Sequence, residues 1–193
     1  VLDPVSFAET LARILDSVDI ACVRLDLSSR DEATISRAAD ALREIAHVRD
    51  VALVITDHLI LAERHGLDGV HLSGAARSVR KARKALGPDA IVGSYCGNSR
   101  HDGMTAGEAG ADYVAFGPAG ASALDDGHRA ERDLFEWWSA MIELPVVAEG
   151  ALGIEDVAAL APVTDFFGIG SEIWDREDPL AALIDLVTPL GIH

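Results

Sequence analysis

Lysine is nearly absent from this sequence, whose 193 residues contain only Lys81 and Lys84. Lysine and arginine together number 16 against 32 aspartates and glutamates, which gives a formal net charge of −16 at pH 7. Proteins bind nucleic acids and anionic membranes mainly through Lys and Arg. The composition therefore argues against both partners, and any anionic substrate requires a local cationic pocket.

Long apolar runs and a cysteine framework are missing as well. No stretch approaches the roughly 20 apolar residues that cross a bilayer, and no basic-then-apolar leader opens the chain. We therefore expect a cytoplasmic protein. Cys22 and Cys96 lie far apart and match neither a metal-binding spacing nor a disulfide pattern, so we expect free thiols.

Short β-rich runs alternate with helical patterns along the whole chain, which predicts a parallel sheet. The β-rich runs are residues 20–25, 51–56, 68–72, 90–94, 112–116, 145–149 and 166–170. Two of them, VALVI and PVVA, are apolar at every position, as in strands that are covered on both faces. Repeating units of about 20 to 30 residues favour a barrel over an open sheet. We expect one domain over residues 1–193, with the (β/α)₈ TIM-barrel fold.

The seven β-rich runs are one short of the eight strands that close such a barrel. The chain starts at Val1, a few residues before its first predicted helix. We expect that the initial strand of the barrel precedes this numbering. An intact mass showing that residue 1 is the native start would contradict this expectation.

In parallel barrels, ligands bind at the carboxyl ends of the strands. The last two strands are followed by the glycine-bearing turns EGALG and GIGSE, whose backbone N–H groups could hold a phosphate. Glycine also occurs at such places only to form a tight turn. No lysine stands at a strand end, which argues against an aldolase that uses a Schiff base. The predicted phosphate-binding residues are Gly150, Ala151, Gly170 and Ser171.

The sequence TDH, residues 56–58, lies where a predicted strand meets a helix. Its carboxylate, Asp57, could hold Mg²⁺ beside a diphosphate, or it could serve only as the N-cap of the helix.

His71 lies inside a predicted strand, where a histidine is more often a hydrogen-bonded core residue than a catalyst. Trp137 and Trp138 fall in a helical pattern, and we expect them to pack on a helix face.

These motifs resemble the thiamin phosphate synthase family and its thiazole tautomerase relatives. The stretch GADYVAFGPAG, residues 110–120, is the strongest single element of the resemblance. The matching stretches follow the family's order over most of the chain, at residues 53–74, 82–94, 110–120, 144–152 and 168–179. The resemblance implies a (β/α)₈ barrel that joins hydroxymethylpyrimidine diphosphate to thiazole phosphate and releases diphosphate with the help of Mg²⁺.

The resemblance also implies roles for individual residues. Arg24 and Ser94 correspond to catalytic residues, and Asp57 to a ligand of Mg²⁺. The residues implied to line the substrate pocket are Thr56, His58, Gly117 and Glu149. Pro118 follows Gly117 as in the synthases, whereas the tautomerases have a histidine there. The implied partners are the two phosphate substrates, and a homodimer is a candidate assembly.

Among the departures from the family's pattern, three replace charged residues that act on the diphosphate and the metal. Asp26 and Asp125 stand where the family has the lysines that face the diphosphate, and Ala76 stands at the second metal carboxylate. These substitutions leave open an alternative, which is a non-catalytic or altered-specificity binder of thiazole phosphate or a thiamin intermediate. The basic residues that could compensate are Arg77, Arg80, Arg100 and Arg129.

Glu149 raises a separate question, because a carboxylate near a bound phosphate would repel it unless the carboxylate is paired or protonated. We expect Glu149 to pair with an Arg or His that lines the barrel, and Arg24 is the first candidate.

Overall fold

The computed structural model describes residues 4–29, 31–120 and 128–191. The chain divides into two compact units, Val1–His71 with Lys81–Val92 and Leu72–Arg80 with Gly93–His193, which are described in turn. The single domain over residues 1–193 stays a prediction.

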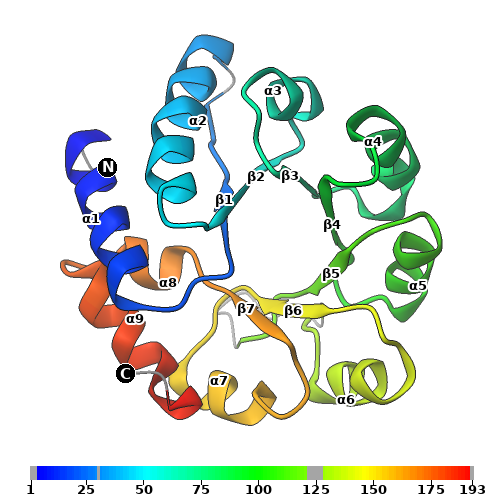
Figure 1. Cartoon of the computed structure of the whole chain (residues 1–193). Coiled ribbons are helices and arrows are strands. Elements are labelled where there is room, and N and C mark those ends of the chain that lie inside the picture. Colours follow the sequence, from blue (N-terminus) through cyan, green and yellow to red (C-terminus); the bar gives the residue numbers. More distant parts are fainter. Residues whose placement is uncertain (1–3, 30, 121–127, 192–193) are drawn as a thin grey trace. The chain divides into compact units, whose positions relative to one another are not determined.

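In the first unit, parallel strands alternate with helices (Figure 1). The elements are α1 (Pro4–Ser17), β1 (Cys22–Leu25), α2 (Glu32–His47), β2 (Ala52–Thr56), α3 (Leu59–Arg64) and β3 (Gly69–Leu72). Strand β2 pairs in parallel with both β1 and β3. The register places Arg24 opposite Val54 and Thr56 opposite His71.

The same alternation continues along the rest of the chain, in which residues 81–92 still belong to the first unit. The next elements are η1 (Ala75–Ser78), α4 (Val79–Leu86), β4 (Ile91–Tyr95), α5 (Arg100–Glu108), β5 (Tyr113–Phe116), α6 (Arg132–Met141), β6 (Val146–Glu149), α7 (Ile154–Leu160), β7 (Phe166–Gly168), α8 (Ser171–Trp174), α9 (Pro179–Val187) and η2 (Thr188–Leu190). Strand β5 pairs in parallel with β4 and β6, and β6 pairs in parallel with β7. Each described strand thus overlaps a β-rich run that the sequence predicts, and β4 extends one residue beyond its run, to Tyr95.

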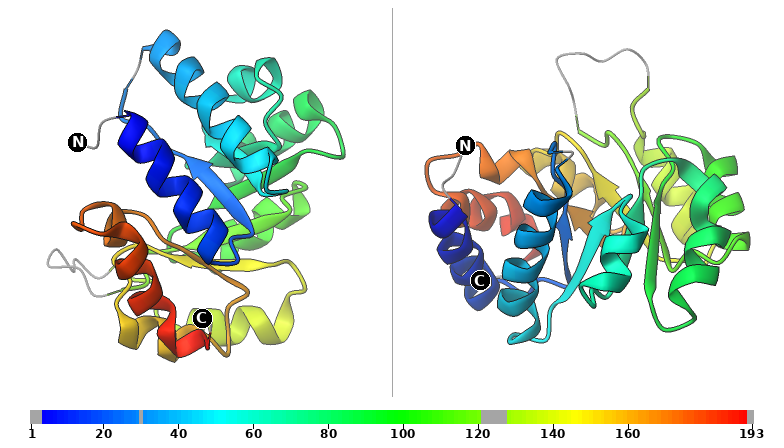
Figure 2. Two further views of the ribbon diagram at one scale, coloured as in Figure 1. Left: turned by 60° about the vertical axis from the view of Figure 1, so that its left-hand side comes forward. Right: turned by 90° about the horizontal axis from the view of Figure 1, so that it is seen from above.

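Helix α2 shows how the sequence determines these elements. Asp31 caps it, because an oxygen of its carboxylate accepts the N–H of Thr34 at 2.9 Å. Four side chains at helical spacing are buried along one face, namely Ile35, Ala39, Leu42 and Ala46. The helix packs against α1 in the same unit (Figure 2).

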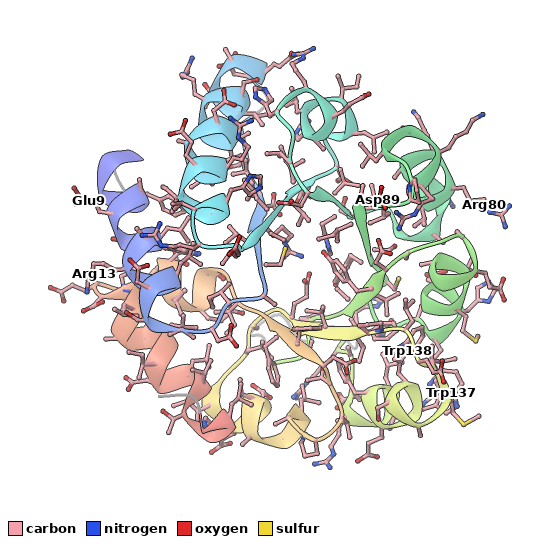
Figure 3. The ribbon with its side chains drawn as sticks, viewed as in Figure 1. Glu9, Arg13, Arg80, Asp89, Trp137 and Trp138 are labelled. Atoms are coloured by element: carbon pink, nitrogen blue, oxygen red, sulfur yellow. The ribbon has the colours of Figure 1, made fainter. Side chains whose placement is uncertain are left out.

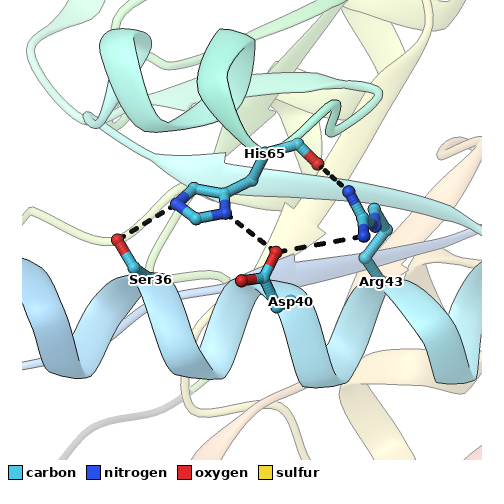
Figure 4. Close-up of polar contacts among 4 residues, drawn as sticks. All are labelled: Ser36, Asp40, Arg43 and His65. Atoms are coloured by element: carbon cyan, nitrogen blue, oxygen red, sulfur yellow. Dashed lines mark hydrogen bonds and ion pairs between the residues drawn. The ribbon is translucent and has the colours of Figure 1, made fainter.

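A polar cluster attaches the end of α3 to α2 (Figure 4). His65 Nδ1 lies 2.8 Å from Asp40 Oδ1, and His65 Nε2 lies 3.0 Å from Ser36 Oγ. Arg43 on α2 also donates to the backbone oxygen of His65. A histidine that is hydrogen-bonded to a serine on one side and to an aspartate on the other is also the arrangement of the catalytic triad of hydrolases. Ser36, however, lies inside α2, where the neighbouring N–H groups bond within the helix and cannot stabilise an oxyanion. We therefore assign the cluster to holding the two helices together.

The second unit has an aromatic core between β5 and α6. The ring of Phe116 meets those of Trp138 and Phe135 edge-on, with centroids 5.0 and 6.0 Å apart. Trp138 is only 1% exposed, and Figure 3 shows it beside Trp137. The guanidinium carbon of Arg100 lies over the ring of Trp137, 4.9 Å from the ring centroid. The expected packing on a helix face is confirmed for Trp138.

Among the described residues, no helix has both the length and the apolar character that crossing a membrane requires. Cys22 is exposed and Cys96 is buried, and neither forms a disulfide. The expectation of free thiols is therefore confirmed.

Candidate functional site

In the first unit, the side chains of Arg24 and His71 meet near the carboxyl ends of β1 and β3. Arg24 Nη1 lies 3.0 Å from His71 Nε2. Because a guanidinium can only donate, Nε2 is the acceptor and the imidazole proton lies on Nδ1. Burial and then the charge of Arg24 lower the pKa of His71 to about 3, although Asp57 acts in the opposite direction. His71 is thus neutral at pH 7, and as predicted it is a hydrogen-bonded, buried residue.

The TDH turn lies beside this pair. Thr56 Oγ1 is buried and has no hydrogen-bond partner among the described residues. Asp57 has the left-handed φ of 58°, and its N–H donates to the backbone oxygen of His71 at 3.0 Å. A buried hydroxyl without a partner and a left-handed residue other than glycine are both features that cluster at binding sites.

The N-cap interpretation of Asp57 is wrong. The N-cap of α3 is His58, which makes no side-chain capping bond. The left-handed backbone at Asp57 moves the start of the helix one residue further along the chain. Asp57 is exposed.

His71 makes stability depend on pH. Its folded pKa of about 3 lies below the unfolded value near 6.5, so the unfolded state binds the extra proton between these values. We therefore expect the free energy of unfolding to fall as the pH is lowered through this range, by up to about 1.4 kcal/mol per pH unit. Urea unfolding at pH 7 and pH 5 measures the slope. His71→Asn should flatten it, and an unchanged slope would contradict the assignment.

In the second unit, the turns that follow β6 and β7 are joined by one side chain. Glu172 Oε1 accepts the N–H of Leu152 at 3.2 Å, and Glu172 Oε2 accepts the N–H of Gly170 at 2.7 Å. Gly150 and Ala151 both have left-handed φ values, 87° and 55°. The turn after β6 is also held by the segment that follows β5, because the N–H of Gly120 donates to Gly150 O at 2.9 Å.

A cavity of about 630 Å³ adjoins these two turns. It is lined by Ala151, Leu152, Gly153, Ile154, Ser171, Glu172, Arg176, Ala182, Asp185 and Leu186. Ala151 and Ser171 are exposed, and their N–H groups have no acceptor within the described part of the chain. Two of the four predicted phosphate-binding residues, Ala151 and Ser171, therefore line one cavity. The phosphate role itself stays a prediction.

Sequence reasoning missed two residues of this cavity, Glu172 and Arg176. The Nε of Arg176 donates to the backbone oxygen of Glu172 at 3.3 Å. The signal in the sequence was the charged run that directly follows the GIGS turn.

Glu149, at the end of β6, is half-buried and lies against Gly168 of β7. A Cβ added at Gly168 would lie 2.9 Å from the Cβ of Glu149, so only glycine leaves room for this side chain. Burial, followed by the charge of Glu149, raises the pKa of Tyr95. The pairing of Glu149 with Arg24 would join the two units and stays a prediction.

Tyr95 is a third residue that the sequence reasoning missed. Its hydroxyl donates to the backbone oxygen of Gly117 at 2.6 Å, next to the cis peptide bond between Gly117 and Pro118. Ser94, one residue earlier, is completely buried, and its Oγ lies 3.7 Å from Cys96 Sγ. The structure thus brings Gly117 and Glu149 near Tyr95, while the catalytic role of Ser94 stays a prediction.

Two of the four basic residues that could compensate, Arg100 and Arg129, contact other groups in the structure. Arg129 donates to Ala119 O at 3.0 Å and to Asp156 at 2.9 Å. Arg100 lies 3.4 Å from Asp133 and stacks on Trp137. Arg77 and Arg80 are exposed, and Figure 3 shows Arg80 pointing outward.

The three departures have different settings. Asp26 is exposed just after β1, and Ala76 lies in η1. Asp125 lies outside the described residues. No group of three or more His, Cys, Asp or Glu is placed to hold a metal ion within the described part of the chain.

A profile of the thiamine monophosphate synthase family matches residues 2–167. A thiamine-phosphate synthase of Rhodospirillum centenum is 42% identical over 188 residues, which cover 95% of this chain and 90% of that protein. One from Hyphomonas neptunium is 37% identical over 188 residues, which cover 94% of this chain and 85% of that protein.

Solved structures share the fold. A thiamine phosphate pyrophosphorylase from Pyrococcus furiosus aligns with a TM-score of 0.83 at 18% identity, over 95% of this chain and 89% of that chain. A native KDPGal structure aligns with a TM-score of 0.72 at 15% identity, over 98% of this chain and 92% of that chain. These likenesses confirm the expected (β/α)₈ class, of which the described residues contain seven strands. The family profile and the relatives go further, and they show that the chain belongs to the thiamine monophosphate synthase family.

Proposed function

We propose that this protein is a thiamine-phosphate synthase, a transferase that joins hydroxymethylpyrimidine diphosphate to thiazole phosphate and releases diphosphate. The observation that carries the proposal is the 42% identity to a thiamine-phosphate synthase over nearly the full length of both chains. The two substrates are small phosphate compounds, and neither nucleic acid nor a membrane takes part. The cytoplasm as the location and a homodimer as the assembly are further parts of the proposal.

The proposed reaction breaks the bond between a diphosphate oxygen and a benzylic-type carbon of the pyrimidine. The thiazole nitrogen then forms the new bond to that carbon. The protein has to neutralise the leaving diphosphate and to align the two rings. Arg24 supplies positive charge, and because His71 is neutral, the hydrogen bond to Nε2 orients the guanidinium without forming an ion pair.

The hydroxyl of Thr56 has no partner among the described residues, and we propose that it donates to an oxygen of the bound diphosphate. Mg²⁺ commonly binds through one or two carboxylates together with substrate phosphates, and it keeps several waters. Asp57, exposed beside Thr56 and His71, fits such a site. A cage made only of protein ligands does not fit, because the described residues form no metal-binding group. Bound Mg²⁺ would neutralise the charge of the departing diphosphate.

Asp57→Asn should therefore raise the Mg²⁺ concentration needed for half-maximal turnover by roughly tenfold, since one carboxylate ligand is lost. Titration of MgCl₂ in the synthase assay measures this change. Glu63→Gln, which removes an exposed carboxylate on α3, serves as the matched control. An equal Mg²⁺ requirement in the wild type and in Asp57→Asn would contradict the assignment.

For the thiazole phosphate, we propose the turns formed by Gly150, Ala151, Gly170 and Ser171. The support is the cavity beside them and the two N–H groups of Ala151 and Ser171 that lack an acceptor in the described part of the chain. Backbone donors bind a phosphate without lysine, in keeping with the lysine-poor sequence.

The alternative, a binder without catalysis, rested on the substitutions at Asp26, Ala76 and Asp125. The two relatives above, which are both named as synthases, do not favour it. Calorimetry with thiazole phosphate alone, run beside a turnover assay, separates the two functions. Binding together with product formation supports the synthase. Binding without product formation would refute it.

A further inference from the structure

Glu172 connects the two glycine-bearing turns through both oxygens of its carboxylate. One oxygen accepts the N–H of Leu152, in the turn after β6, at 3.2 Å. The other accepts the N–H of Gly170, in the turn after β7, at 2.7 Å. A single anionic group thus takes one donor from each turn.

The charge of this carboxylate has no cation opposite it. Within the described ranges, no arginine, lysine or histidine forms an ion pair with Glu172, and Arg176 bonds to its backbone oxygen instead. The side chain is half-buried and lines the cavity that also contains Ala151 and Ser171. The turns therefore hold an anion by backbone donors alone, which is also how a phosphate would be held there.

A phosphate and this carboxylate compete for the same place. The N–H of Gly170 belongs to the proposed phosphate donors and is already used by Glu172. A phosphate oxygen at this donor would lie within hydrogen-bond distance of the carboxylate, and like charges at that distance repel each other. A bound phosphate therefore requires the carboxylate to move out of the turn.

We propose that Glu172 lowers the affinity of these turns for phosphate, because its carboxylate occupies the anion position between them and is displaced by the phosphate of the substrate. This inference rests on the proposed function, because it takes thiazole phosphate as the incoming anion. Displacing the carboxylate opposes the binding of every phosphate equally. Inorganic phosphate brings no other contacts and is rejected, whereas thiazole phosphate also contacts the protein through its ring.

Glu172→Gln tests the proposal, because the amide keeps an acceptor and loses the charge. Inorganic phosphate is the probe, and its Kd is measured by calorimetry and by inhibition of synthase turnover. We expect the Kd to fall roughly tenfold in Glu172→Gln and in Glu172→Ala. Glu155→Gln, on the exposed first turn of α7, makes the same change in net charge and should leave the Kd within about twofold.

Unchanged or weaker phosphate binding in both Glu172 variants overturns the proposal, and weaker binding would assign Glu172 to holding the turns in place. An equal gain in Glu155→Gln also overturns it, because the effect would then come from surface charge in general. Failure of the proposed function is a different result, since wild-type protein would then form no thiamine phosphate whatever its affinity for inorganic phosphate.

Discussion

Arg24→Met should lower kcat/KM for thiamine phosphate formation about 100-fold while the protein stays folded. A unit charge about 4 Å from a phosphate contributes about 4 kcal/mol at an effective dielectric of 20. Arg24 is exposed, and screening by solvent reduces this to about 2–3 kcal/mol. Because about 1.4 kcal/mol corresponds to a factor of ten in rate, a loss of about 2–3 kcal/mol lowers kcat/KM about 100-fold. Initial rates at saturating Mg²⁺ give the measurement.

Two controls make the Arg24 experiment specific. Arg37→Met removes an exposed arginine of α2 and should leave kcat/KM unchanged. In Arg24→Met, NMR titration should find the pKa of His71 raised, because the charge of Arg24 is one of the causes that lower it. If turnover survives in Arg24→Met although this pKa has risen, Arg24 does not face the diphosphate.

Gly69→Ala should destabilise the protein by about 3 kcal/mol or more, because β3 lies too close to the chain at Ile91 for a side chain to fit. A Cβ at Gly69 would lie 1.8 Å from the backbone oxygen of Ile91. The neighbouring backbone is fixed by the bond from Ile91 N–H to Asp68 O at 2.8 Å, so little relaxation is available. For a chain of this size, about 3 kcal/mol corresponds to a decrease in Tm of roughly 6–12 °C.

Gly74→Ala is the matched control for Gly69→Ala. Gly74 has a φ of −92°, and nothing lies within 4 Å of an added Cβ. The substitution should change the free energy of unfolding by no more than about 0.5 kcal/mol. Thermal unfolding followed by circular dichroism compares the two variants. Equal melting temperatures would show that the close approach at Gly69 is not a constraint.

The strands were the most predictable part of the fold. The run at residues 51–56 became β2, Ala52–Thr56, whose three central residues are buried, as its continuous apolar character indicated. The contact of Arg24 with His71 was not predictable in the same way. It joins β1 to β3 across the intervening β2, and no local pattern encodes which side chains meet two strands apart.

In the candidate site, too, contacts between distant segments could not be predicted from local sequence patterns. The glycine-bearing turns after β6 and β7 were found from the sequence, because their spacing follows two β-rich runs. The bridge formed by Glu172 was missed, since Leu152 and Gly170 approach it only after the two turns have packed. Asp57 was interpreted as a possible N-cap because an aspartate where a strand meets a helix often caps the helix. Its left-handed φ, which is rare at a residue other than glycine, has no signal in the sequence.

The central claim is that this chain is a working synthase, despite the acidic residue at Asp26 and the missing carboxylate at Ala76. The most direct test incubates the wild-type protein with hydroxymethylpyrimidine diphosphate, thiazole phosphate and Mg²⁺, and follows thiamine phosphate and diphosphate together. We predict that both products form in equal amounts over many turnovers and that chelation of Mg²⁺ stops their formation. The absence of thiamine phosphate from a folded, substrate-binding preparation would contradict the claim.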